Sequence, residues 1–185
     1  MRWPAMRARG RYTPVTDCSI NPRAAELIRD LGLTPHPEGG YFRELFRARD
    51  TVQPSDARGT RPALTTIYFL LAGSAVSRWH RVRSHEVWHH YEGAPLELLT
   101  IPHNEVRLER AILGPYGAEQ APVHCVPAGW WQAARSLGAY TLVGCTVGPG
   151  FEYSDFELLA DRPELAGRLA GALPEVARFV APLED

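Results

Sequence analysis

The chain has 185 residues, of which 45% are hydrophobic, and this suits one compact domain with a core of its own. Its formal net charge of −1 argues against binding to nucleic acid or to a membrane surface, and no apolar run approaches the length of a transmembrane helix. All 20 basic residues are arginine. The absence of lysine excludes a Schiff base and with it pyridoxal phosphate (PLP) chemistry, and no Gly-rich phosphate loop indicates a nucleotide cofactor.

The beginning of the chain is basic and has no continuous apolar stretch of the kind found in signal peptides. We expect a flexible tail over residues 1–18, a single domain over residues 19–185 and a cytoplasmic location. A targeting role for the tail is the alternative.

The three cysteines, Cys18, Cys125 and Cys145, are widely spaced and form no CxxC pair. This spacing argues against a disulfide framework and against a structural zinc site. Cys125 and Cys145 fall in apolar strands, where we expect buried small hydrophobic residues, with a catalytic thiol as the alternative.

The first predicted element is a short helix over residues 21–32. Asn21 suits the N-cap, Pro22 suits the first helical position, and Gly32 suits the C-terminal stop. The apolar stripe of this helix consists of Leu27, Ile28 and Leu31. The loop at residues 34–40, with two prolines and two glycines, predicts a fixed turn.

From Tyr41 onward the hydrophobic pattern has a period of two, and no helical segment separates its repeats. Many short strands at regular intervals are typical of an antiparallel sandwich or barrel and disfavour a parallel βαβ sheet. The predicted strands cover residues 41–48, 64–71, 76–81, 86–91, 96–101, 105–112, 123–126, 130–134 and 140–147.

Two other regions complete the outline. Residues 50–62 are rich in Pro, Ser, Asp and Arg and indicate a mobile loop. After residue 150 the pattern becomes helical again, with a helix from Pro163 to Leu173 opened by Asp161 and a second helical turn over residues 174–180.

The residues that carry chemistry concentrate between positions 77 and 93. Side chains alternate along a strand, so Glu86, Trp88 and His90 share one face and His89 lies on the other. His80 belongs to the preceding strand, across a short turn. A histidine and a glutamate on paired strands can converge inside a barrel as a metal site or as an acid–base pair.

A second informative segment follows the turn at Pro127-Ala128-Gly129. Gln132 lies there on a strand beside Trp130 and Trp131, so it is an amide in apolar surroundings. Such an amide needs hydrogen-bond partners or a ligand.

These segments resemble the cupin superfamily. Glu86 followed by Gly93 matches the end of the first cupin motif, His80 lies at its first histidine, and Pro127-x-Gly129 matches the second motif. More specifically, roughly residues 22 to 160 resemble the cupin subfamily known as DUF985. The matching stretches are 35–44, 77–81, 86–89, 93–96, 127–132 and 149–156.

The resemblance implies an all-β fold, an antiparallel double-stranded β-helix (cupin jelly-roll barrel) with short N- and C-terminal helices. It also implies a homodimer, and we expect the strand around residues 41–49 near the interface because such barrels leave sheet edges that a subunit can cover.

The departures from the cupin pattern bear on the metal. A typical metal cupin has a second histidine where this chain has Val82, and a third where it has Gln132. The implied ligand set for a divalent metal ion is therefore reduced to His80, Glu86 and Gln132, and glutamine is a poor ligand for zinc, copper or iron. His90 shares the face of Glu86 and could restore a ligand or carry a proton.

Further candidates surround this pair. We expect Gln132, Tyr68, Trp88, Arg78, His36 and Glu44 to contact a small-molecule substrate. Four of these residues have a plain structural alternative: His36 could cap its Pro-rich turn, Tyr68 and Trp88 could pack in the core, and Arg78 could face solvent. His80 and Glu86 could also simply hydrogen-bond to each other.

The sequence therefore supports a cupin that acts on a small polar metabolite as an isomerase or epimerase. His80 or His90 would act as the base, Glu86 would orient it, and Gln132 or a weakly held metal would stabilise an enolate. The alternatives are a non-catalytic small-molecule-binding cupin and a metal-dependent oxygenase.

Overall fold

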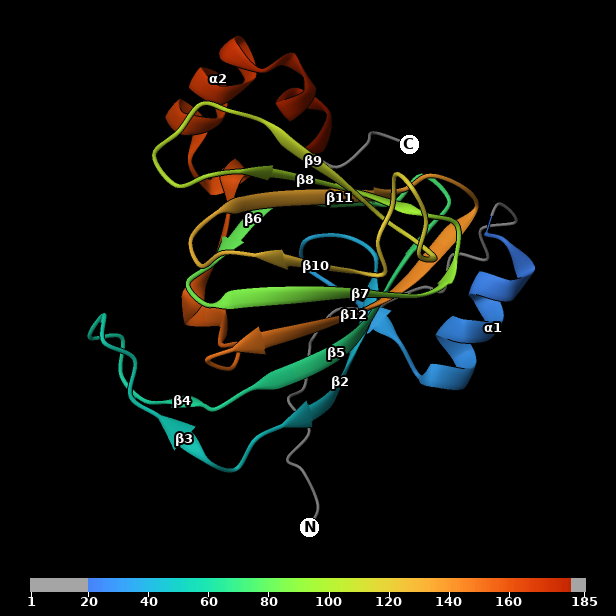
Figure 1. The fold of residues 1–185 in the computed structure, drawn as a ribbon, viewed down its shortest axis with the longest axis horizontal. Helices are drawn as coiled ribbons and strands as arrows, with labels where there is room; N and C mark the ends of the chain where they lie inside the picture. Colours follow the sequence, from blue (N-terminus) through green and yellow to red (C-terminus); the bar gives the residue numbers. More distant parts are fainter. Residues whose placement is uncertain (1–19, 181–185) are drawn as a thin grey trace, which may run out of the picture.

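The computed structural model describes residues 20–180, and its core is two antiparallel sheets that face each other (Figure 1). The predicted basic tail lies outside the described residues. The six-stranded sheet has the order β1 (Thr34–Pro35), β2 (Tyr41–Arg47), β5 (Thr65–Ala72), β12 (Tyr140–Gly148), β7 (His85–Gly93) and β10 (Val123–Val126). The five-stranded sheet has the order β13 (Phe156–Leu158), β6 (Val76–Val82), β11 (Trp131–Ser136), β8 (Leu96–Ile101) and β9 (Glu109–Leu113). A separate pair, β3 (Thr51–Val52) and β4 (Arg61–Pro62), forms a small hairpin.

This architecture confirms the antiparallel sandwich or barrel predicted from the period-two pattern and the jelly roll that the family resemblance implies. Each of the nine predicted strands has a counterpart, and the strands that the pattern missed have two or three residues each. The strand predicted over 105–112 begins only at Glu109. The residues before it form a turn in which Glu105 N donates to Pro102 O and Asn104 adopts a positive φ.

Three hydrophobic clusters stabilise the barrel, one inside it and one on each outer face. The inner cluster lies between the sheets and includes Phe69, Trp88 and Val143. On the outside of the six-stranded sheet, helix α1 (Pro22–Leu31) packs through Ala24 and Leu27. On the outside of the five-stranded sheet, helix α2 (Pro163–Ala172) and the 3₁₀ helix η3 (Pro174–Phe179) cover a third cluster.

Helix α1 begins and ends where its sequence predicts. The Asn21 side chain accepts a hydrogen bond from Arg23 N, Pro22 is the first helical residue, and Gly32 adopts the left-handed conformation at the C-terminus. The prediction that Asp161 opens the second helix is wrong: the residue before Pro163 is Arg162, and Asp161 belongs to the 3₁₀ helix η2 (Leu159–Asp161).

The prediction that both Cys125 and Cys145 are buried is correct for only one of them. Cys145 on the central strand β12 is buried, as predicted, but Cys125 is exposed. Because β10 is the outermost strand of its sheet, the alternate side chains of this strand face solvent while Val126 points into the core.

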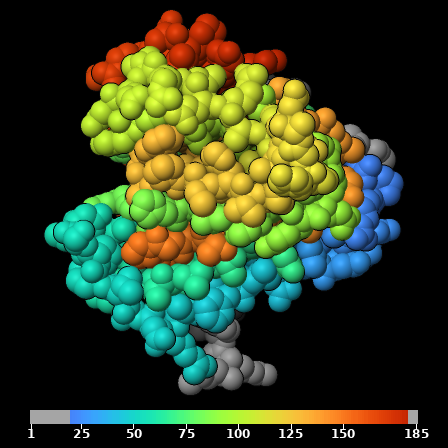
Figure 2. Space-filling view, viewed as in Figure 1, coloured from blue at the N-terminus to red at the C-terminus, as the bar shows by residue number. Residues whose placement is uncertain are grey.

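The loop predicted over residues 50–62 contains the β3–β4 hairpin, which extends from the barrel at the lower left of Figure 1 and protrudes in the space-filling view (Figure 2). Arg58 and Arg61 connect this hairpin to the buried carboxylate of Asp155, with N–O distances of 3.2 and 2.8 Å. Asp155 belongs to the 3₁₀ helix η1 (Tyr153–Asp155), so the hairpin is held close to the segment that carries Tyr153. In the described part of the chain, no helix is long and apolar enough to cross a membrane.

Candidate functional site

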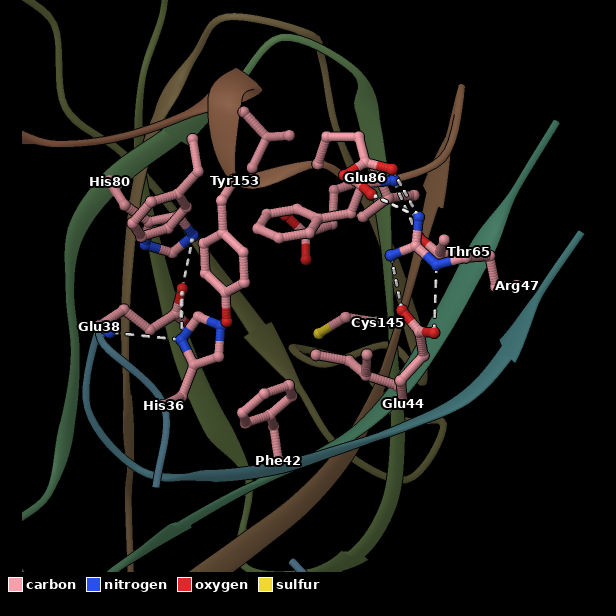
Figure 3. Close-up of a pocket in the computed structure, with 16 residues that line it drawn as sticks. His36, Glu38, Phe42, Glu44, Arg47, Thr65, His80, Glu86, Cys145 and Tyr153 are labelled. Atoms are coloured by element: carbon pink, nitrogen blue, oxygen red, sulfur yellow. Dashed lines mark hydrogen bonds and ion pairs between the residues drawn. The ribbon is translucent and has the colours of Figure 1, made fainter. Parts of the chain in front are cut away.

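A pocket of about 150 Å³ lies between the two sheets (Figure 3). Its walls are mostly apolar, and its polar groups gather on two sides. His36, Glu38 and His80 lie on one side, Glu44 and Arg47 on the other, and the Tyr153 ring projects between them (Figure 3). An apolar cavity of about this volume holds a molecule the size of benzene, so the pocket suits a small ligand.

A chain of buried polar side chains forms the inner part of the site. Glu38 Oε2 lies 3.5 Å from His36 Nδ1 and 3.2 Å from His80 Nε2. Gln132 Nε2 is 3.0 Å from His80 Nε2 and donates to Glu86 Oε2 at 2.5 Å. These polar side chains therefore form a continuous row of contacts from His36 through Glu38, His80 and Gln132 to Glu86.

A bulge brings two members of β6 to the same carboxyl group. Between β11 and β6 the register shifts, so that Gln132 pairs with His80 and Ala134 with Ser77. The extra residue on β6 reverses the alternation, and both Ser77 and His80 face inward although they are three positions apart. Ser77 Oγ donates to Glu38 Oε1 at 3.0 Å.

Hydrogen bonds outside the pocket fix the orientation of the two central side chains. His80 Nδ1 lies 2.8 Å from Arg78 O, which accepts only from a protonated nitrogen, so Nε2 of the neutral ring carries the lone pair. Trp88 Nε1, which can only donate, bonds to Gln132 Oε1 at 3.0 Å. The amide nitrogen of Gln132 must therefore point toward His80 and Glu86.

Burial favours the neutral form of each titratable side chain in this row from His36 to Glu86. Desolvation raises the pKa of Glu38 to about 8, against the hydrogen bond from Ser77, and lowers the pKa of His36 to about 3. Burial also lowers the pKa of His80 and raises those of Glu86 and of the Cys145 thiol beside it. Near neutral pH the Glu38 side chain is thus a carboxylic acid next to an unprotonated imidazole nitrogen.

The structure brings His80, Glu86 and Gln132 together. The prediction that His80 and Glu86 lie on paired strands is wrong: β6 and β7 belong to different sheets, and the two side chains meet across the space between them. His90 does not join them. Its Nε2 lies 3.2 Å from Ala94 O, and it is not part of the pocket wall. Glu86 and His90 lie on the same face of β7, as the alternation predicts, but four residues along a strand span about 13 Å. His90 is therefore too far along the strand to reach the pocket.

The other predicted residues divide between the pocket and its surroundings. His36 and Glu44 line the pocket. Trp88 holds the Gln132 amide from behind. Tyr68 is not in the pocket, because on β5 it alternates with the inward-facing Ile67 and Phe69 and packs instead with the α1 cluster. The Arg78 guanidinium donates to Pro37 O and thereby fastens the loop that carries Glu38.

Sequence reasoning missed Glu38, Arg47 and Tyr153 as pocket residues. The available signal for Glu38 was the turn Pro35-His36-Pro37-Glu38-Gly39-Gly40, in which a histidine and a glutamate lie two positions apart. Arg47 is held at the mouth by two carboxylates, those of Glu44 and Glu152, each at 2.8 Å. No local pattern predicts that these three side chains converge.

The residues present do not fit the metal site of a typical cupin. Gln132 stands at the position of a histidine ligand, but its oxygen is bonded to Trp88 and its NH₂ group faces His80 and Glu86. An amide NH₂ donates hydrogen bonds and has no lone pair for a cation. Within residues 20–180, no three His, Cys, Asp or Glu side chains are arranged to hold a metal ion.

Two antiparallel sheets that enclose a pocket, with His80 on one sheet and Glu86 on the other, define the class of cupin barrels. Within this class the chain belongs to the family described as "Cupin superfamily (DUF985)", whose model matches residues 25–159.

Solved structures agree with this assignment. The chain is similar to a hypothetical protein from Leishmania major, with 30% identity, a TM-score of 0.71, and coverage of 84% of this chain and 96% of that one. It is also similar to a protein from Shewanella oneidensis, with 32% identity, a TM-score of 0.73, and coverage of 86% and 98%. Oxalate decarboxylase from Bacillus subtilis shares the fold alone, with 15% identity, a TM-score of 0.52, and coverage of 82% of this chain and 37% of that one. No curated protein matches the chain.

Proposed function

We propose that this cupin catalyses proton transfer on a small polar molecule, an isomerisation or epimerisation next to a carbonyl group, without a metal ion. The observation that carries the proposal is the pairing of a buried carboxyl group with the lone pair of a buried imidazole, Glu38 Oε2 with His80 Nε2, at 3.2 Å on the pocket wall. This is the arrangement that general acid–base catalysis needs, namely a proton donor and a proton acceptor within reach of one substrate.

In the proposed step, His80 Nε2 takes a proton from the carbon next to the carbonyl group. The electron pair of that C–H bond forms the C=C bond of an enol, and the carbonyl oxygen takes the proton of Glu38. In an epimerisation, the imidazolium returns its proton to the same carbon, and Glu38 recovers its proton from the enol oxygen as the carbonyl group re-forms. In an isomerisation, the carbon that lost its proton carries a hydroxyl group; the imidazolium delivers its proton to the former carbonyl carbon, and Glu38 takes the proton of that hydroxyl group as the new C=O bond forms. The net proton count of the protein does not change.

The surroundings support this chemistry in two ways. The hydrogen bond from His80 Nδ1 to Arg78 O fixes the tautomer in which Nε2 is the acceptor. The Gln132 amide donates to Nε2 and holds the ring in place until the substrate proton takes that position. The apolar wall, including Val82 and Phe156, keeps water away from the enol.

The test is deuterium incorporation. The protein is incubated in D₂O with an extract of small metabolites, and mass spectrometry identifies compounds that gain one mass unit. We expect incorporation with the wild type and its loss in His80→Asn and Glu38→Gln. His103→Asn, which changes an exposed histidine outside the pocket, is the matched control and should retain the exchange. If no metabolite gains deuterium, or if the His80 variant keeps the exchange, the proposal is wrong.

A second candidate is a non-catalytic binding module. The observation that favours it is that Gln132 bonds to both His80 and Glu86, so these groups already have partners within the protein. A binder would retain its ligand through purification and release it unchanged, whereas the enzyme would return a deuterated compound. The third possibility, a metal-dependent oxygenase, lacks support because Gln132 presents its NH₂ group to the site.

A further inference from the structure

Aromatic rings surround the pocket between its mouth and its polar floor. Phe42, Phe151, Tyr153 and Phe156 all line it. Phe151 packs edge-to-face against Tyr153 at 5.2 Å and against Phe156 at 6.0 Å, and Phe156 stacks on His80 at 5.4 Å. On the opposite wall, Phe42 meets His36 at 4.6 Å. Aromatic faces carry partial negative charge and attract cations that lie over them.

The mouth of the pocket is negatively charged, as the faces of the aromatic rings are. Arg47 is the single arginine among the described residues that line the pocket. It is already bound, because its Nε and Nη2 donate to Glu44 and its Nη1 donates to Glu152 and to Phe151 O. One guanidinium between two carboxylates leaves an excess of one negative charge at the entrance and no free cation for an anionic ligand.

The floor of the pocket offers hydrogen-bond acceptors. The carboxyl groups of Glu38 and Glu86 and the lone pair of His80 Nε2 face the cavity, and the Gln132 amide is already bonded to Glu86 and His80. An ammonium group, with several N–H donors or polarised methyl groups, complements the oxygen atoms and the imidazole lone pair of this floor, whereas a carboxylate or a phosphate would find no cation there to neutralise its charge.

From these three features we propose that the pocket selects a small organic cation, an amine or a methylated ammonium compound. The proposal deepens, and in that sense rests on, the proposed function, because it names the class of substrate for the same site. It distinguishes this cupin from one that acts on an organic dianion or on a sugar nucleotide, since both carry negative charge that neither the mouth nor the floor can neutralise.

The test uses isosteric probes that differ in charge. Choline, with a trimethylammonium head, is compared with 3,3-dimethylbutan-1-ol, its uncharged counterpart, and with 3,3-dimethylbutanoate, which is anionic. Isothermal titration calorimetry, supported by ligand-observed NMR, should show that choline binds at least about tenfold more tightly than either of the others. If choline binds no better than the alcohol, including the case in which neither binds measurably, the proposal is overturned.

Two variants assign the preference to the residues named. Phe151→Leu removes one ring but keeps an apolar side chain, and it should weaken choline binding by roughly twofold to thirtyfold while changing the affinity for the alcohol less. Glu152→Gln neutralises one mouth carboxylate and should also weaken choline binding, whereas Glu164→Gln, at an exposed position on α2, should not. Equal losses for choline and the alcohol would contradict a role for charge.

The outcome separates this inference from the proposed function. Preferential binding of choline without deuterium exchange in any metabolite would support the cation pocket and refute the enzyme. Deuterium exchange confined to neutral or anionic metabolites, without preference for choline, would support the enzyme and refute the cation pocket.

Discussion

At the scale of single residues, the orientation of one amide decides what the site can do. Gln132 lies where related barrels place a ligand, but Trp88 Nε1 takes its oxygen and turns its NH₂ group toward His80 and Glu86. The indole can only donate, so this orientation follows from the chemistry of tryptophan and from its buried position. The site is therefore organised by hydrogen bonds.

The orientation of the Gln132 amide predicts how the site responds to metal ions. Q132H replaces the amide with an imidazole, so that the variant has three possible metal ligands together with His80 and Glu86. We expect its Kd for Zn²⁺ to fall by at least about tenfold relative to the wild type. Calorimetry and elemental analysis of protein prepared without a metal-affinity tag would measure the change. W88F, which frees the amide oxygen, should give a smaller gain. A wild type that holds one equivalent of metal, lost in H80N, would contradict the assignment.

The buried carboxyl group of Glu38 predicts a dependence of stability on pH. Its pKa in the folded state is about 8, above the ordinary value of 4.5, so the folded protein binds the proton more tightly than the unfolded chain does. The folded protein therefore loses stability as the pH rises from 4.5 to about 8. His36 and His80, whose pKa values are lowered, act in the opposite direction only below about pH 6.5. Glu86, whose pKa is also raised by burial, acts in the same direction as Glu38. Between about pH 6.5 and 8 the Glu38 carboxyl group alone should therefore lower the unfolding free energy by up to about 2 kcal/mol.

Glu38→Gln should flatten this slope, because glutamine keeps the shape of the side chain but cannot ionise. Urea denaturation at several pH values would measure the slope in both proteins. A variant with the wild-type slope between pH 6.5 and 8 would show that Glu38 does not titrate there.

At the scale of elements, the turn between β1 and β2 and the bulged strand β6 form one unit. Glu38 O accepts from Arg78 N at 2.8 Å, and Gly39 lies so close to β6 that a Cβ there would be 2.1 Å from Val76 O. The close approach, together with a φ of +109°, requires glycine at this position. The contact places Glu38 between His36 and His80.

Gly39→Ala should therefore disrupt this unit, with a loss of unfolding free energy of about 3 kcal/mol or more. Gly73→Ala is the matched control, because Gly73 also has a positive φ, +61°, but a Cβ there meets nothing within 4 Å. We expect that control to cost only about 1–2 kcal/mol of backbone strain. Chemical denaturation would compare the two, and equal losses would show that the contact with β6 is unimportant.

At the scale of the whole molecule, one sheet edge is open. In the described part of the chain, β1 pairs with β2 only at Tyr41 and Phe42, and beyond these residues the outer edge of β2 has no neighbouring strand. Leu45 and Phe46 are 44% and 51% exposed there. An edge with exposed apolar side chains is a site for pairing with another chain, which agrees with the homodimer that the family resemblance implies.

We therefore predict a homodimer through β2. Light scattering at micromolar concentration should give about twice the chain mass of 20.6 kDa for the wild type and the chain mass for Phe46→Arg, because the charge would be buried without a partner. Val106→Arg, at a loop residue that is 50% exposed, should remain dimeric. A monomeric wild type would refute the prediction.

The sequence by itself determined the elements and much of the inner site. Local signals are sufficient for this: the caps at Asn21 and Gly32 act within one helix, and alternation along a strand decides which side chains share a face. Parity therefore placed Glu86 on the inner face, but it could not separate Glu86 from His90, because it defines a face and not a distance along it. Parity also could not show that His80 and Glu86 lie on facing sheets and not on paired strands.

Only the tertiary structure decided which residues that are far apart in the sequence meet at the site. Glu38 reaches His80 because the turn that carries it packs on β6, and Arg47 meets Glu152 at the mouth across a separation of 105 residues. The orientation of Gln132 depends in the same way on Trp88, which belongs to the other sheet. Such contacts leave no local pattern in the sequence, since folding alone sets the distances and the solvent exclusion that change the proton affinities of these groups.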